Sequence, residues 1–239
     1  MTRDKLYIVM PVYNEGDAIE KVVAEWHSVV DSAGSGSRLV VFDDGSTDNT
    51  SAILERMKNN HSNLTVITKT NTGHGPTCTA AYKFAVAENA DWVFQTDSDG
   101  QTKSDDFRSF WERRGEFDFI IGWRKRRKDG PARWCISRTL KLAVWIIFGT
   151  ALKDVNAPFR LMKVERLRRY LPLIPDDYFL PNALLSIMIA KNNEKIAWRE
   201  ISFVPRPSGS SSVPLRRVAG MGIRLLSQLY KMRNMKLPP

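Results

Sequence analysis

The chain has 239 residues and a formal net charge of +10, and 43% of its residues are hydrophobic. This length and composition suit one large globular domain or two small ones and exclude a largely disordered chain. Two cysteines are too few for a disulfide framework or a zinc cluster. The longest charge-free apolar run, Tyr178–Ala190, falls short of the roughly 20 residues of a spanning helix. We therefore expect no transmembrane helix, and MTRDKLYIVMPVYNE contains no signal-peptide pattern.

Short apolar runs alternate with helix-period segments through the first half of the chain. Strands are expected at Leu6–Val12, Leu39–Phe42, Leu64–Thr68, Trp92–Thr96 and Phe119–Gly122. Helices are expected at Asp17–Val30, Ser46–Asn59 (capped by Ser46 or Thr47), Ala80–Ala87 and Phe107–Trp111. This alternation predicts an α/β fold with a mostly parallel sheet flanked by helices.

The second half is less regular. Helices are expected at Trp134–Leu152, Val164–Tyr170, Asn182–Ala190 and Val218–Met235, strands at Phe159–Met162 and Ile196–Val204, and a loop at Pro205–Pro214. No linker is evident, so we expect one domain over residues 1–212 and a basic amphipathic helix over residues 213–239.

Positive charge is concentrated in two stretches. Gly122–Trp145 holds eight basic residues and one acidic residue, and the chain after Glu200 holds seven basic residues and no acidic one. The rest of the chain is net acidic, which predicts two surfaces with different partners. The basic side suits phosphate groups, nucleic acid or an anionic membrane, or is simply a solvated surface.

Polar clusters follow four of the expected strands. They are Tyr13–Glu15, Asp43-Asp44, Asn71–Gly75 and Asp97–Gln101. Because ligands of parallel α/β sheets bind at the carboxyl ends of the strands, this shared position predicts one binding site.

The last of these clusters has the residue types of a cation site. Asp97 and Asp99 are two residues apart, so both carboxylates can approach one hard cation, and Gln101 offers a carbonyl oxygen. Such ligands suit Mg²⁺ or Mn²⁺, with nucleotide phosphates completing the shell. The alternative is an Asx-turn that leads into the next helix.

The other clusters each have two interpretations. Asp43 either accepts hydrogen bonds from a nucleobase or ribose, or closes its own turn. Glu15 either contacts the nucleotide or is an acidic residue favoured at a helix start. Gly73 and Gly75 would let backbone amides approach a diphosphate, although the chain here lacks the lysine of a P-loop, and His74 fits a turn or surface histidine.

Four stretches, IVMPVYNEGD, VVFDDGSTDNT, NTGHGPTCTAAYKFA and VFQTDSDGQ, together resemble the inverting family 2 glycosyltransferases of the Rossmann-like GT-A fold. The resemblance covers roughly the first 125 residues and implies a nucleotide-sugar donor and a divalent metal. It implies nucleotide-sugar contacts from Pro11, Tyr13, Glu15, Asp43, Gly73, Gly75, Asp97, Ser98 and Asp99, and a Mg²⁺ or Mn²⁺ ion bound by Asp97, Asp99 and Gln101.

Three later stretches, IIGWRKRRKDGPARWCISR, DVNAPFRLMK and FVPRPSGSSS, resemble the dolichyl- and polyprenyl-phosphate sugar synthases. The resemblance implies a polyprenyl phosphate acceptor and a single inverting displacement. Asn156-Ala157-Pro158 and Ser212 depart from the usual pattern of that group. The residues implied to grip the acceptor phosphate are Arg124, Arg133 with Ser137, and Arg206 before Gly209 and Ser211.

Two other functions compete with this hypothesis. A family 2 enzyme of cell-surface polysaccharide synthesis would use a sugar hydroxyl and need a carboxylate base, for which Asp176 and Asp177 are candidates. A nucleic-acid-binding module would use the basic stretches, but these lack interleaved aromatic residues, so we expect no nucleic-acid partner.

The final expected helix is amphipathic and basic. Its apolar stripe is Val218, Met221, Leu225, Leu229 and Met232, widened by Leu226 and Tyr230 and bordered by Arg217, Arg224 and Lys231. Such a helix either lies in a membrane interface or packs on the core, and the segment with Trp134, Leu142, Trp145, Ile146 and Phe148 has the same two interpretations. We expect a cytoplasmic enzyme, peripheral on the inner face of the membrane, that contacts an anionic membrane surface or a membrane protein partner.

Overall fold

The computed structural model of the chain describes residues 4–124, 131–204, 222 and 225–238, with the backbone alone for residues 131–136. Within these residues the chain forms a seven-stranded sheet in the order β3-β2-β1-β4-β6-β5-β7. Of these strands only β6 runs antiparallel to its neighbours, so the expected mostly parallel sheet is confirmed. The strands are β1 (Leu6–Val12), β2 (Arg38–Asp43), β3 (Leu64–Thr68), β4 (Trp92–Gln95), β5 (Phe119–Trp123), β6 (Arg160–Lys163) and β7 (Ile196–Glu200).

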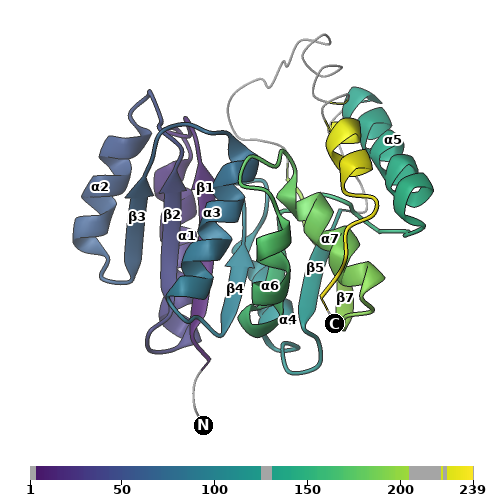
Figure 1. Cartoon of the computed structure of the whole chain (residues 1–239). Helices are drawn as coiled ribbons and strands as arrows, with labels where there is room; N and C mark the ends of the chain where they lie inside the picture. The colour runs from purple at the N-terminus through teal and green to yellow at the C-terminus, as the bar shows by residue number, and fades with distance from the viewer. Residues whose placement is uncertain (1–3, 125–130, 205–221, 223–224, 239) are drawn as a thin grey trace.

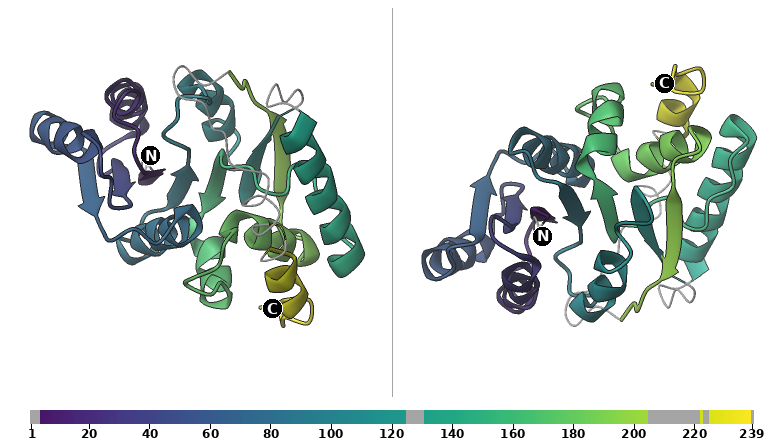
Figure 2. Two further views of the ribbon diagram at one scale, coloured as in Figure 1. Left: turned by 90° about the horizontal axis from the view of Figure 1, so that it is seen from above. Right: turned by 90° about the horizontal axis from the view of Figure 1, so that it is seen from below.

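Helices cover both faces of this sheet (Figures 1 and 2). They are α1 (Ile19–Ala33), α2 (Thr50–Asn60), α3 (His74–Ala87), α4 (Phe107–Trp111), α5 (Pro131–Phe148), α6 (Val164–Tyr170) and α7 (Pro181–Lys191), with short 3₁₀ helices at Ser104–Asp106 and Leu171–Leu173. None of the described helices has the length and apolar character that crossing a membrane requires.

Strand β1 shows why the sequence folds into three layers. Alternate side chains of a strand point to opposite faces of the sheet. Leu6 and Ile8 join a core cluster with Trp26 of α1, whereas Tyr7 and Val9 join a second cluster with Tyr82 of α3. Both faces of β1 are therefore buried, and its sequence reads as a continuous apolar run rather than an alternating one.

Two expected helix starts are wrong for reasons visible in the loops. Helix α2 begins at Thr50 rather than Ser46, because Ser46 and Thr47 bond to other strand-end residues and neither caps the helix. Helix α3 already begins at His74, so in the Gly-rich turn (Asn71–Gly75) Gly73 is the N-cap of this helix and Gly75 lies in its first turn.

The carboxyl-terminal helix ends earlier than expected. Among the described residues, 222 and 225–231 are helical and a turn follows, so the helix ends before the expected Met235; its expected start at Val218 lies outside the described residues. Leu225 and Leu229 are buried in one core cluster with residues of α5 and α7, which confirms core packing for that part of the apolar stripe. The loop expected at Pro205–Pro214 and the expected boundary between residues 212 and 213 lie outside the described residues.

Candidate active site

The loops after β1 and β2 are tied into one edge. Asn14, with a left-handed φ of 53°, accepts a hydrogen bond at Oδ1 from the Thr47 amide at 2.7 Å, and its own amide donates to Ser46 Oγ at 3.0 Å. The Glu15 amide donates to Thr50 Oγ1 at 2.9 Å. The sequence predicted only that Asn14 lies in a turn, and asparagine is among the few residues that readily adopt this conformation. Tyr13 projects 47% exposed from this edge, and Pro11 is buried within β1.

Asp43 and Asp44 both bond inward. Asp43 is fully buried, and its carboxylate accepts hydrogen bonds from the backbone and hydroxyl of Ser46 and from the Ser51 hydroxyl. This geometry favours the turn-closing interpretation of Asp43 over a nucleobase contact. Asp44 pairs with Lys69 and accepts from the Thr72 amide; these bonds outweigh the opposing effect of burial and lower the pKa of Asp44.

The two glycines of the Gly-rich turn, expected to face a diphosphate, both make contacts within the protein. The Gly73 amide, expected to face a diphosphate, donates to Asp44 at 2.8 Å, and Gly73 has a left-handed φ of 95°. A Cβ atom at Gly75 would lie 2.3 Å from the carbonyl oxygen of Phe179 and 2.5 Å from that of Tyr178. The absence of a side chain at Gly75 therefore lets the segment before α7 close against the start of α3.

We expect Gly75→Ala to lower the free energy of unfolding by about 1–3 kcal/mol, because backbone oxygens cannot give way to the new methyl group. Urea unfolding measures the change. Gly115→Ala is the matched control, since a Cβ there meets nothing within 4 Å. Equal stability of the two variants would contradict the packing role of Gly75.

The Asp97–Gln101 turn follows β4, as expected. The Asp97 side chain is 29% exposed, yet its Oδ1 atom is buried and has no hydrogen-bond partner among the described residues. Asp99 Oδ1 accepts from the Gln101 amide at 3.0 Å, which is the Asx-turn geometry, and Ser98 is buried. The turn and a cation site are thus compatible, because the turn uses one oxygen of Asp99 and leaves Asp97 Oδ1 for another ligand.

These residues fit a divalent cation held jointly with phosphates. Within the part of the chain that is described, no three His, Cys, Asp or Glu side chains gather closely enough to hold a metal ion. Carboxylates from Asp97 and Asp99 alone leave most of the shell to other oxygen ligands. Mg²⁺ and similar ions are commonly bound in this way, by one or two carboxylates, waters and substrate phosphates.

Gln101 links this turn to the chain that leads toward Arg206. Its side-chain amide donates to the Val204 carbonyl at 3.2 Å, and the Val204 amide donates to the Gln101 carbonyl at 2.9 Å. A β-bridge between Thr102 and Phe203 strengthens the link. The predicted donor turn and the segment before the late basic loop are therefore held side by side.

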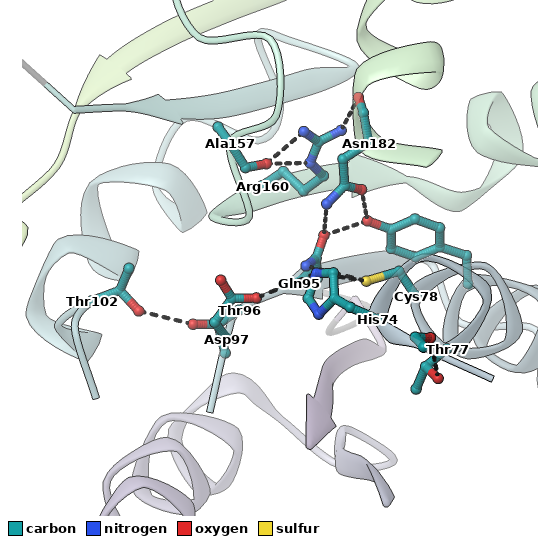
Figure 3. Close-up of polar contacts among 12 residues, drawn as sticks. His74, Thr77, Cys78, Gln95, Thr96, Asp97, Thr102, Ala157, Arg160 and Asn182 are labelled. Carbon is teal, nitrogen blue, oxygen red and sulfur yellow. Dashed lines mark hydrogen bonds and ion pairs between the residues drawn. The ribbon is translucent and has the colours of Figure 1, made fainter. Parts of the chain in front are cut away.

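His74 lies closer to this turn than predicted. Its Nε2 atom is 3.9 Å from Asp97 Oδ1 and 3.4 Å from Cys78 Sγ (Figure 3). Interaction with Cys78, and also with Asp97, raises the pKa of His74. The sequence pattern indicated only a turn or surface position, because nothing local shows that the first residue of α3 faces the end of β4.

A buried polar network lies beside the turn and was not predicted (Figure 3). Tyr82 of α3 bonds to Gln95 of β4 and to Asn182 of α7, and Asn182 Nδ2 donates to Gln95 Oε1 at 2.7 Å. Gln95 Nε2 contacts Cys78 Sγ at 3.7 Å. The consecutive elements α3 and β4 are thus joined to the distant α7 close to Asp97.

Arg160 extends this network and is fully buried. Its guanidinium donates to the Ala157 carbonyl through Nε at 2.9 Å and also through Nη2, and to the Asn182 carbonyl at 3.2 Å. Burial lowers the pKa of Arg160. Arg160 therefore fastens the loop before β6 to the start of α7.

The predicted acceptor residues are only partly described. Arg124 donates from Nε and Nη2 to Asp154 Oδ2 at 3.1 and 3.0 Å, and its guanidinium lies 5.2 Å from the centre of the Phe203 ring. Ser137 lies half-buried on α5. The Arg133 side chain, and all of Arg206, Gly209 and Ser211, lie outside the described residues. Asp176, a candidate base, pairs with Lys83 and its side chain is 84% exposed.

Comparison with known families agrees with this geometry. The sequence model of glycosyl transferase family 2 matches residues 7–170. The chain is 23% identical over 227 residues to the undecaprenyl-phosphate 4-deoxy-4-formamido-L-arabinose transferase of Pseudomonas paraeruginosa, covering 94% of this chain and 65% of the relative. It is 24% identical over 243 residues to the dodecaprenyl-phosphate galacturonate synthase of Rhizobium johnstonii, covering 98% and 69%. The chain thus spans about two thirds of these relatives, and slightly less of the first.

Solved structures share the fold at low identity. The glucosyl-3-phosphoglycerate synthase of Mycobacterium tuberculosis, in complex with Mn²⁺, UDP and glucosyl-3-phosphoglycerate, superposes with a TM-score of 0.70 at 16% identity, covering 98% of this chain and 81% of that one. Its complex with Mn²⁺ and UDP-glucose gives a TM-score of 0.70 at 18% identity, covering 99% and 80%. The likeness confirms the GT-A architecture.

Proposed function

Because the chain belongs to glycosyl transferase family 2, we propose that it transfers a sugar from a nucleotide-sugar donor to a polyprenyl phosphate. The observation that carries the donor half is the position of Asp97 and Asp99 past β4, with a buried Asp97 oxygen that has no hydrogen-bond partner in the described residues. The acceptor half is supported by the two polyprenyl-phosphate relatives and by the excess of basic residues after β5.

The proposed mechanism is a single displacement at the anomeric carbon, with inversion. A lipid phosphate is already anionic near neutral pH, so it attacks without a protein base. Arg124, Arg133 and Arg206 would offset its repulsion from the donor diphosphate and align it for attack. A divalent cation bound by Asp97, Asp99 and Gln101 would supply charge stabilisation for the departing nucleoside diphosphate.

The ion pair between Arg124 and Asp154 bears on how Arg124 would bind the acceptor phosphate. Its bond to Asp154 is largely buried, so the guanidinium is held in one orientation before any acceptor binds. A carboxylate on one edge of a guanidinium leaves the other edge for a phosphate, because the group carries five N–H donors. We therefore assign Asp154 to orienting Arg124.

A sugar-hydroxyl acceptor is the competing proposal, and the geometry favours it less. It requires a carboxylate base close to the reacting centre. Of the two candidate bases, Asp176 is mostly exposed and bonded to Lys83, which suits a surface ion pair better than a base, and Asp177 is exposed as well. A membrane-lipid acceptor would instead bring the chain to the cytoplasmic face of the membrane, as a peripheral protein or through a membrane protein partner.

The direct test is a transfer assay with a panel of nucleotide sugars and with polyprenyl phosphate, a glycan or no acceptor, in Mg²⁺, Mn²⁺ or EDTA. We expect a lipid-linked sugar only when lipid phosphate and a divalent cation are both present. Transfer to glycan hydroxyls, with none to lipid phosphate, would refute the proposed acceptor.

We expect Arg133→Ala to raise the KM for polyprenyl phosphate about 10-fold or more, because one charge-assisted contact is lost. The KM for the donor should change less than about twofold, since the contact is made to the acceptor. Initial rates over a matrix of the two substrate concentrations give both values. Arg56→Ala, a surface position on α2, is the control, and unchanged acceptor kinetics in Arg133→Ala would contradict the assignment.

A further inference from the structure

Large exposed apolar side chains in the described part of the chain are concentrated on two helices. Apart from Tyr13, all of them lie on α5 or on the 225–231 helix. We call them the helix patch: Leu142, Trp145 and Ile146, exposed by 56%, 58% and 67%, with Leu226 and Tyr230, exposed by 40% and 57%. Single exposed apolar residues are ordinary on protein surfaces, but a group of this kind marks an interaction surface.

The two helices are fixed by side chains other than those of the patch. Val144 and Phe148 of α5 share a buried core cluster with Leu225 and Leu229. In Figure 1 both helices lie toward the end of the sheet formed by β5 and β7. Because the inner residues are anchored, the patch residues cannot turn inward to complete the core, and they remain available to a partner.

The charge around the patch indicates which partner it fits. Helix α5 carries Arg133, Arg138 and Lys141 and no acidic residue, and the chain after Glu200 carries none either. Lys231 and Arg233 are exposed beside Tyr230. A second copy of this chain would bring the same positive charge against itself, whereas anionic lipid headgroups complement it.

We propose that the helix patch docks on an anionic bilayer, with Trp145, Ile146 and Leu142 entering the headgroup boundary and the basic residues meeting lipid phosphates. Tryptophan and tyrosine favour that boundary because each has an apolar ring and one polar group. The docking itself is argued from exposure and charge, and only its purpose rests on the proposed function. Because α5 begins shortly after Arg124, docking would hold the acceptor side of the site near lipid-borne phosphates.

Flotation with phosphatidylcholine vesicles, with and without 30% phosphatidylglycerol, tests the docking surface. We expect the wild-type chain to bind the anionic vesicles, more weakly as salt rises. Trp145→Ser with Ile146→Ser should reduce partitioning about 10-fold or more, since two apolar side chains no longer enter the interface. Both positions are solvent-exposed, so the melting temperature should be unchanged, which separates lost docking from misfolding.

Two variants with the same change of charge test whether basic residues beside the patch attract the anionic bilayer. Lys231→Glu should weaken binding to anionic vesicles several-fold, whereas Arg108→Glu, the same charge change on exposed α4, should leave it nearly unchanged. Equal loss in both variants would show that only net charge matters and would overturn a defined surface. A lipid-free dimer in sedimentation, disrupted by the Trp145 and Ile146 substitutions, would overturn it in favour of self-association.

The outcome is separable from that of the proposed function. Transfer to a short-chain, water-soluble polyprenyl phosphate should proceed equally in wild type and patch variants, because docking is not required there. If the wild-type chain carried out soluble transfer but did not bind anionic vesicles, the patch alone would be rejected. Vesicle binding that depends on the patch, with no transfer to any lipid phosphate, would reject the proposed acceptor and leave the docking surface standing.

Discussion

Asp97→Asn is expected to reduce sugar transfer about 1,000-fold or more, which corresponds to roughly 4 kcal/mol of transition-state stabilisation. The substitution keeps the size of the side chain and removes its charge. Asp97 Oδ1 is buried without a hydrogen bond in the described residues, and its nearest described charge is the partly exposed His74 at 3.9 Å. The loss should therefore fall on catalysis and ligand binding rather than on folding.

Two measurements separate these effects. Mn²⁺ with a nucleoside diphosphate should raise the melting temperature of the wild-type chain, because a ligand bound only to the folded state stabilises it, and this increase should nearly vanish in Asp97→Asn. Asp105→Asn, an exposed aspartate on the following 3₁₀ helix, is the matched control and should behave like wild type. Full activity of Asp97→Asn would exclude the proposed metal ligand.

Much of the donor half was predictable because its signals are local. Strands β1 and β3 have the expected bounds, and each polar cluster does follow a strand. A short apolar run that ends in Asn, Asp or Gly specifies both a buried strand and the loop after it. Since parallel strands end at one edge, the position of a site follows from the order of elements alone.

The roles of single residues within that site were less predictable. They depend on which side chains already have hydrogen-bond partners within the folded protein. Asp43 illustrates the problem: a carboxylate after a strand suits a nucleotide contact or a turn equally well. Its burial, and its bonds to Ser46 and Ser51, favour the turn. The same holds for Gly75. A glycine is needed there because two carbonyl oxygens, about a hundred residues away in the sequence, leave no room for a side chain.

The polar network was invisible for the same reason. None of its three side chains looks unusual in the sequence. Gln95 ends a strand, Tyr82 lies within a helix, and Asn182 directly follows the proline that begins α7. Tyr82 and Asn182 are 100 positions apart, and no local pattern shows that they meet. The antiparallel insertion of β6 between β4 and β5 brings Arg160 beside them, and hydrophobic periodicity does not encode strand direction.

Arg160→Met is expected to lower the free energy of unfolding by about 2–5 kcal/mol, because the Ala157 and Asn182 carbonyls lose donors in a buried site. For a chain of this length that is a fall in melting temperature of roughly 5–20 °C. Urea unfolding followed by circular dichroism measures the change. Arg56→Met removes an arginine from an exposed pair with Glu20 and should change stability by no more than about 0.5 kcal/mol.

The position of Arg160 adds a functional consequence. Ala157 and Asp154 share one loop, and Asp154 orients Arg124, so loosening the loop should raise the KM for the lipid phosphate more than that for the donor. Arg160→Lys should recover part of the stability, because an ammonium group can reach one carbonyl but cannot serve both with a planar fork. If Arg160→Met were as stable as Arg56→Met, the guanidinium would not join α7 to the loop before β6, and the link inferred between the network and the acceptor side would fail.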